Sequence, residues 1–132
     1  MADQARSDDF RGRILVAEDE PHIRRILITM LEAENYEVIA TPDGRAAITR
    51  LETEEPIDLV VTDLMMPKAS GLEVLAQVQD LEHRRSTPVL VLTAKGQDAD
   101  REAAFKLGAH DFMTKPFSPK KLLARINEIL HG

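Results

Sequence analysis

The sequence predicts an α/β fold, a doubly wound parallel sheet of five strands in a single domain. Five short apolar runs alternate with amphipathic stretches, a pattern typical of βαβ units. The first run, residues 14–17, is continuously apolar, as expected for a strand that is buried on both faces. A chain of 132 residues also suits one domain of ordinary size. Because parallel crossovers are right-handed, we expect helices on both faces of the sheet.

The first elements follow a polar stretch without apolar periodicity. Residues 1–12 are expected to form a flexible leader and residues 13–132 the domain, which no linker or repeat divides. Residues 14–17, Ile-Leu-Val-Ala, form the first expected strand, which stops at the acids 18–20. Pro21 suits the first turn of a helix, which Asp19 or Glu20 can cap. Its apolar residues recur at three- and four-residue steps: Ile23, Ile26, Leu27, Met30 and Leu31.

The middle of the chain repeats this alternation. Residues 36–40 are expected to form the second strand, 41–44 a turn and 45–52 a helix. Residues 57–62 form the third expected strand. A loop rich in Met, Pro and Gly then leads to a helix over about residues 72–81.

The last third of the domain follows a charged run at residues 82–85, which is expected to be a solvated loop. Residues 88–92 predict the fourth strand and residues 98–107 the next helix, which Gly108 can end in a left-handed conformation. Residues 110–114 form a weaker fifth strand. The last helix presents its apolar residues on one face: Leu122, Leu123, Ile126, Ile129 and Leu130.

Composition excludes several classes of function. The absence of cysteine rules out disulfides, thiolate zinc sites and thiol nucleophiles, and it suits a reducing cytoplasm. With 17 Lys+Arg against 23 Asp+Glu the net charge is -6, so direct binding of nucleic acid is not expected. No apolar run is long enough to span a membrane, and residues 1–11 lack a signal-peptide core. We therefore expect a cytoplasmic protein that binds neither membrane nor nucleic acid.

Polar side chains gather where the expected strands end. Glu18 and Asp19 follow the first strand, and Asp63 follows the third. Thr93 stands at the end of the fourth strand and Lys115 after the fifth. Ligands of open parallel sheets bind at the carboxyl ends of the strands. If the first and third strands are neighbours, three carboxylates converge there.

Converging carboxylates repel one another, so each needs either a raised pKa or a cation beside it. Mg²⁺ prefers oxygen ligands and takes one or two carboxylates, here expected from Asp19 and Asp63. Thr93 and Lys115 add a hydroxyl and an ammonium that can hold a phosphoryl group. Because a carboxylate can act as a nucleophile and form an acyl phosphate, the set predicts a phosphoryl-transfer site.

The chain resembles the receiver domains of two-component response regulators over about residues 13–131. The resemblance lies in four segments in the family's order: ILVAEDE at 14–20, LVVTDLMMPKASG at 59–71, VLVLTA at 89–94 and GAHDFMTKPFSPKKL at 108–122. It implies the flavodoxin-like fold of the chemotaxis regulators, with strand order 2-1-3-4-5 and five helices.

The resemblance also implies a role for each polar residue. Asp63 would accept a phosphoryl group from the phosphohistidine of a sensor histidine kinase or a histidine phosphotransfer protein. Asp19 and Asp63 would bind Mg²⁺, or another divalent cation such as Mn²⁺, directly. Glu18 would act through a water, and Met65 would contribute its backbone carbonyl. Lys115 would pair with a phosphoryl oxygen.

The output of such a domain would be a change of surface. By resemblance, Thr93 would move to hydrogen-bond the phosphoryl group and Phe112 would turn inward as the switch aromatic. Pro116 matches a proline that follows a cis peptide bond. The fourth helix, fifth strand and fifth helix would then control a downstream protein or homodimerisation. Asp111 and Arg125 match charged positions of relatives that dimerise, whereas Lys121 replaces a frequent acid.

Two other functions fit this architecture. A small magnesium-dependent phosphohydrolase with an aspartyl-phosphate intermediate would carry a second acid two residues after the nucleophile, where this chain has Met65. A flavin-binding domain would need a phosphate loop rich in hydroxyls and glycine where the acids 18–20 stand. A switch that catalyses only its own phosphotransfer and autodephosphorylation therefore fits better than an enzyme.

Overall fold

The computed structural model describes residues 10–94 and 98–132 and contains one parallel sheet. The strand order is β2-β1-β3-β4-β5, so the predicted fold class and strand order are confirmed. Most of the expected leader, residues 1–9, lies outside the described residues. The strands are β1 (Arg13–Ala17), β2 (Glu37–Thr41), β3 (Leu59–Thr62), β4 (Val89–Thr93) and β5 (Asp111–Thr114).

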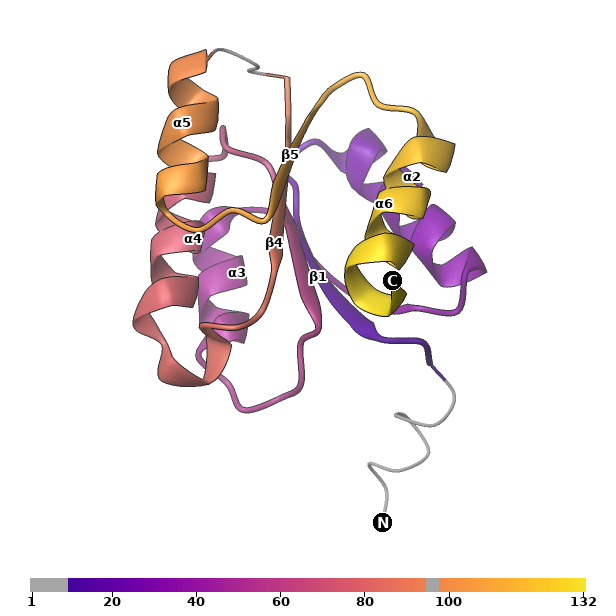
Figure 1. Ribbon diagram of the computed structural model, residues 1–132, viewed down its shortest axis with the longest axis horizontal. Coiled ribbons are helices and arrows are strands. Elements are labelled where there is room, and N and C mark those ends of the chain that lie inside the picture. Colours follow the sequence, from indigo (N-terminus) through magenta and orange to yellow (C-terminus); the bar gives the residue numbers. More distant parts are fainter. Residues whose placement is uncertain (1–9, 95–97) are drawn as a thin grey trace.

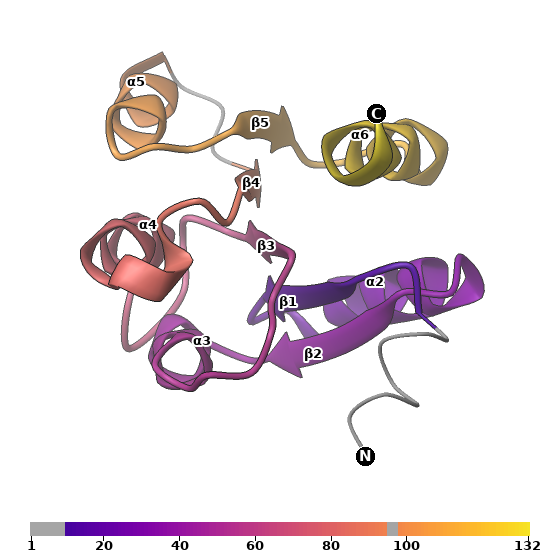
Figure 2. The same cartoon turned by 60° about the horizontal axis from the view of Figure 1, so that its bottom comes forward.

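Helices cover both faces of the sheet, as predicted. In Figures 1 and 2, α3, α4 and α5 lie on one side of the strands, and α2 and α6 lie on the other. The part of the chain described here holds five α-helices and one short 3-10 helix. They are α2 (Pro21–Ala33), α3 (Gly44–Leu51), α4 (Gly71–Asp80), η1 (Glu82–Arg84), α5 (Asp98–Lys106) and α6 (Pro119–His131).

Each face of the sheet has its own apolar core. In β1, Leu15 and Ala17 pack on the side of α3, α4 and α5, whereas Ile14 and Val16 pack on the side of α2 and α6. All four side chains are buried, which explains why the strand is continuously apolar. Burying such a side chain stabilises the fold by about 1.5–3 kcal/mol, with Ala at less. The two cores hold the carboxyl ends of the strands at a common edge.

Capping residues begin the helices close to the predicted positions. The Glu20 side chain caps α2 by accepting hydrogen bonds from the backbone N–H groups of His22 and Ile23. Ser70 and Glu73 form a reciprocal capping box at the start of α4. Gly108 has φ +99°, which confirms the left-handed conformation expected after α5.

The charged run at residues 82–85 differs from its prediction. Residues Glu82–Arg84 form η1, and Arg84 is only 3% exposed, so the expectation of a solvated loop was wrong there. Arg84 Nε donates to Leu51 O at 3.0 Å, and its Nη2 donates to Thr53 O at 2.8 Å. The guanidinium thus satisfies the Leu51 carbonyl at the end of α3, and it shares the Thr53 carbonyl just beyond with His83 Nε2.

The helices can be compared with the length and apolarity that a membrane-spanning helix needs. Across residues 10–94 and 98–132, no helix is both long and apolar enough to cross a lipid bilayer.

Candidate functional site

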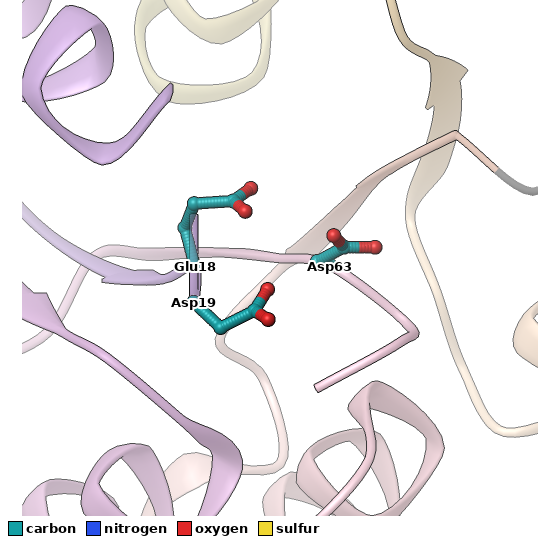
Figure 3. Close-up of side chains that lie close together, drawn as sticks. All are labelled: Glu18, Asp19 and Asp63. Carbon is teal, nitrogen blue, oxygen red and sulfur yellow. The ribbon is translucent and has the colours of Figure 1, made fainter. Parts of the chain in front are cut away.

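Strand register places Glu18 beside Asp63. Ala17 pairs with Thr62 across β1 and β3, and Asp63 N donates to Ala17 O at 3.1 Å. The next residue of each strand therefore leaves the sheet at the same level. Figure 3 shows the carboxylates of Glu18, Asp19 and Asp63 gathered there, with one oxygen of each within 4.8 Å of the others. The predicted convergence of three carboxylates is confirmed as geometry.

Glu18 is held at several atoms. Its side chain is almost fully buried, and its backbone N–H donates to Thr41 O at 3.1 Å. Oε2 accepts a hydrogen bond from Glu20 N at 3.1 Å. Burial raises the pKa of Glu18, and the hydrogen bond from Lys115 opposes that rise. The carboxylate is therefore fixed in place at a cost in desolvation.

Lys115 reaches the two buried carboxylates from the end of β5. Its Nζ donates to Glu18 Oε1 at 2.6 Å and to Asp63 Oδ2 at 2.9 Å. Burial lowers the pKa of Lys115, but the hydrogen bonds to Glu18 and Asp63 outweigh it and raise the pKa above its ordinary value. The ammonium is therefore charged at neutral pH and balances part of the acidic site.

Asp19 forms the open side of the site. It is exposed, and within the described ranges its carboxylate takes part in no hydrogen bond or ion pair. Three carboxylates and one ammonium leave excess negative charge that faces solvent at Asp19. Because all the acidic donors are oxygens, the set fits a hard cation such as Mg²⁺.

Thr93 and Phe112 lie behind this edge. Thr93 ends β4 and is fully buried, and its carbonyl accepts a hydrogen bond from Lys115 N at 2.9 Å. Phe112 is 5% exposed, with its ring centroid 6.4 Å from that of Phe105. The Arg101 guanidinium lies over both rings, 5.0 Å from the centroid of Phe112. The ring thus packs inward, against α5.

The loop after β3 places Met65 beside Asp63. Met65 N donates to Asp63 Oδ1 at 3.3 Å, while the Met65 side chain is 59% exposed. On the other flank, the Lys115–Pro116 peptide bond is cis, as the resemblance implied. Six of the seven residues predicted for the site and its switch therefore lie at the carboxyl edge of the sheet or in the loops that leave it: Glu18, Asp19, Asp63, Met65, Thr93 and Lys115. The seventh, Phe112, lies inside β5, where it pairs with Val91.

Two residues that support the site escaped the sequence analysis. Arg24 Nη1 donates to the backbone carbonyl of Glu18 at 2.8 Å. Gly71 begins α4 so close to β3 that a Cβ atom there would lie 2.1 Å from Asp63 O. Arg24 is not among the apolar residues that predicted its helix, and Gly71 fell in the loop rich in Met, Pro and Gly before the next helix. Neither pattern predicts the backbone carbonyl that Arg24 contacts or the one that lies close to Gly71.

Comparison with known proteins gives consistent results. A family model for the response regulator receiver domain matches residues 14–127. The alkaline phosphatase synthesis transcriptional regulatory protein PhoP of Bacillus subtilis is 44% identical over 118 residues, which are 89% of this chain and 48% of PhoP. The transcriptional regulatory protein ResD of the same organism is 41% identical over 118 residues, 89% of this chain and 48% of ResD.

A solved structure shares the whole architecture. The chemotaxis protein CheY4 of Vibrio cholerae superposes with a TM-score of 0.84 at 28% identity, covering 90% of this chain and 98% of that one. Against the curated relatives the coverage is uneven, since the chain spans about half of their length.

Proposed function

Because the chain belongs to the response regulator receiver domain family, we propose that it is a phosphorylation-controlled switch of a two-component system. Asp63 accepts a phosphoryl group from the phosphohistidine of a sensor histidine kinase or a histidine phosphotransfer protein. The observation that carries the proposal is the cluster of Asp63 with Glu18, Asp19 and Lys115 at the carboxyl edge of the sheet. The proposal places the chain in the cytoplasm, in keeping with its lack of cysteine.

A divalent cation, Mg²⁺ or Mn²⁺, completes the site. Asp19 and Asp63 would hold it directly, Glu18 would act through a water, and Met65 would contribute its backbone carbonyl. When bound, the cation neutralises charge on the phosphoryl oxygens as the group is transferred. The exposed Asp19 carboxylate and the excess negative charge of the site support this assignment.

The chemical step uses the chain's own residues. A carboxylate oxygen of Asp63 attacks phosphorus, so a P–O bond forms and the P–N bond to the donor histidine breaks. The ring nitrogen keeps the electron pair and takes a proton from solvent. Lys115, already 2.9 Å from Asp63 Oδ2, exchanges part of its contact for a phosphoryl oxygen. The Thr93 hydroxyl donates a hydrogen bond to another phosphoryl oxygen.

The output of the switch is a change in α5, β5 and α6. Movement of Thr93 toward the phosphoryl group releases space that the Phe112 ring fills, and this ring is already buried in the structure. The surface then binds a downstream protein or a second copy of the chain. Arg125 pairs with Asp111 of the same chain and with Glu128, so a homodimer that uses these charges must exchange partners.

The proposal is tested by intact mass after incubation with acetyl phosphate and Mg²⁺. The wild type gains one phosphoryl group, Asp63→Asn gains none, and the gain falls when a chelator removes Mg²⁺. Asp80→Asn, at the exposed end of α4, is the matched control and labels as the wild type does. An unlabelled wild type, or equal labelling of Asp63→Asn, contradicts the proposal. Repeated turnover of a phosphate monoester would instead favour the phosphohydrolase.

A further inference from the structure

Asp19 is the least supported of the three acids. Lys115 holds the carboxylates of Glu18 and Asp63, whereas the Asp19 carboxylate has no such partner in the described part of the chain. Its direction is therefore set by the backbone of the turn between β1 and α2. Whatever fixes that turn also fixes where Asp19 points.

Arg24 bridges this turn from outside the site. Its backbone N–H donates to Glu20 O at 2.9 Å, in the first turn of α2. Its Nη1 donates to Glu18 O at 2.8 Å. That carbonyl belongs to the peptide bond that joins Glu18 to Asp19, so the guanidinium fixes the plane of this peptide. A hydrogen bond with a charged donor is about twice as strong as a neutral one.

We propose that Arg24 is a positioning residue of the cation site, which holds the Glu18–Asp19 peptide so that the Asp19 carboxylate faces Asp63. The proposal rests on the proposed function, because it assigns Arg24 to the cation and phosphorylation site. Arg24 touches neither the cation nor the phosphoryl group. It acts through the backbone of the acidic turn.

The sign of the effect separates positioning from simple electrostatics. A guanidinium near the site repels a divalent cation, so through charge alone the loss of Arg24 would tighten Mg²⁺ binding. Through positioning, its loss weakens binding, and supporting residues of metal sites change affinity by about 10–100-fold. Because the site keeps two other carboxylates, we expect a value near the lower end of that range.

Mg²⁺ affinity is measured by following the backbone amide signals of Asp63 and Met65 by NMR during titration. Arg24→Ala weakens Mg²⁺ binding about tenfold, and Arg24→Lys, which keeps the charge on a shorter and differently shaped donor, falls between it and the wild type. Arg25→Ala is the matched control, because Arg25 is exposed and contacts no partner within residues 10–94 and 98–132. It binds Mg²⁺ like the wild type or slightly more tightly. Unchanged or tighter binding by Arg24→Ala overturns the proposal.

A metal-free measurement keeps the result independent of the proposed function. Glu20 N–H donates to Glu18 Oε2 at 3.1 Å, so its hydrogen exchange reports whether the turn is fixed. Arg24→Ala speeds this exchange several-fold, whereas Arg25→Ala does not. If the Glu20 amide of Arg24→Ala exchanges as slowly as that of the wild type, the positioning role is overturned. This result holds even if the wild type binds no Mg²⁺ and the proposed function is wrong. Should Arg24→Ala not fold, Arg24→Lys decides both measurements.

Discussion

Lys115 is the residue on which the charge balance of the site depends, since its ammonium bonds both Glu18 and Asp63. Breaking a buried ion pair by removing one partner costs about 3–5 kcal/mol, because the other charge stays buried. Lys115→Met should therefore lower the free energy of unfolding by about 3 kcal/mol. Mg²⁺ should restore part of the loss by taking over the charge.

Urea unfolding with and without Mg²⁺ measures both effects. Lys121→Met is the control, because it removes an exposed lysine at the start of α6 and should change stability little. A loss in Lys115→Met that is the same with and without Mg²⁺ would show that the cation does not replace the ammonium.

Tyr36 makes stability depend on alkaline pH. Burial raises the pKa of Tyr36 above its ordinary value of 10.0, with Arg11 opposing the rise, and the hydroxyl donates to Asn127 Oδ1. Because the unfolded chain loses this proton first, the stabilisation is complete below pH 10 and is lost as the pH rises through the folded-state pKa. The stability difference between wild type and Tyr36→Phe should therefore shrink above pH 10. A difference that stays constant across that range in urea unfolding would refute this expectation.

The position of helix α4 depends on the absence of a side chain at Gly71, where the helix begins. A Cβ atom on Gly71 would lie 2.1 Å from Asp63 O and 2.8 Å from Leu64 Cα, and backbone atoms cannot rotate away. Gly71→Ala should therefore push α4 from β3 and lower the free energy of unfolding by about 2 kcal/mol, within the usual cost of overpacking. Gly12→Ala is the control in urea unfolding, since its nearest new contact is 3.4 Å. Equal stability of the two variants would contradict the close packing at Gly71.

The packing of Phe112, in β5, against α5 can be tested for a role in the switch. Phe112→Leu keeps an apolar side chain but loses the ring that packs with Phe105 and under Arg101. We expect this variant to be phosphorylated normally while the NMR shift changes of β5 and α6 amides on phosphorylation become small. Phe117 is partly buried and packs against the core on the side of α2 and α6, so Phe117→Leu should keep these shift changes. Normal shift changes in Phe112→Leu would mean that the ring only packs.

For the whole molecule, local patterns were enough to predict the fold class, whereas the strand order came from the resemblance to receiver domains. The continuous apolar run at residues 14–17 and its abrupt stop at the acids 18–20 mark β1, which is buried on both faces. Strand ends then predicted the site, because parallel strands bring their carboxyl ends to one edge. Element boundaries differ from the predicted ones mainly by one or two residues, as at β3, which begins at Leu59 instead of residue 57.

Contacts between distant backbone and side-chain atoms could not be predicted in this way. Arg84 lies in a run of charged residues, yet it is buried. Its guanidinium donates hydrogen bonds to the carbonyls of Leu51 and Thr53, more than 30 residues earlier in the chain. Arg24 and Gly71 depend in the same way on where Glu18 O and Asp63 O lie in space. Hydrophobic periodicity reports which face of an element is buried, but it carries no information about such partners.

The position of the phosphoryl group shows whether Asp63 is the phosphoacceptor. After phosphorylation with acetyl phosphate and Mg²⁺, borohydride reduction of the acyl phosphate followed by peptide mass spectrometry identifies the modified residue. If Asp63 is the phosphoacceptor, Asp63 is modified, and Asp19 and Glu18 stay unmodified in the same sample. Modification of another acid while Asp63 stays intact would contradict this assignment.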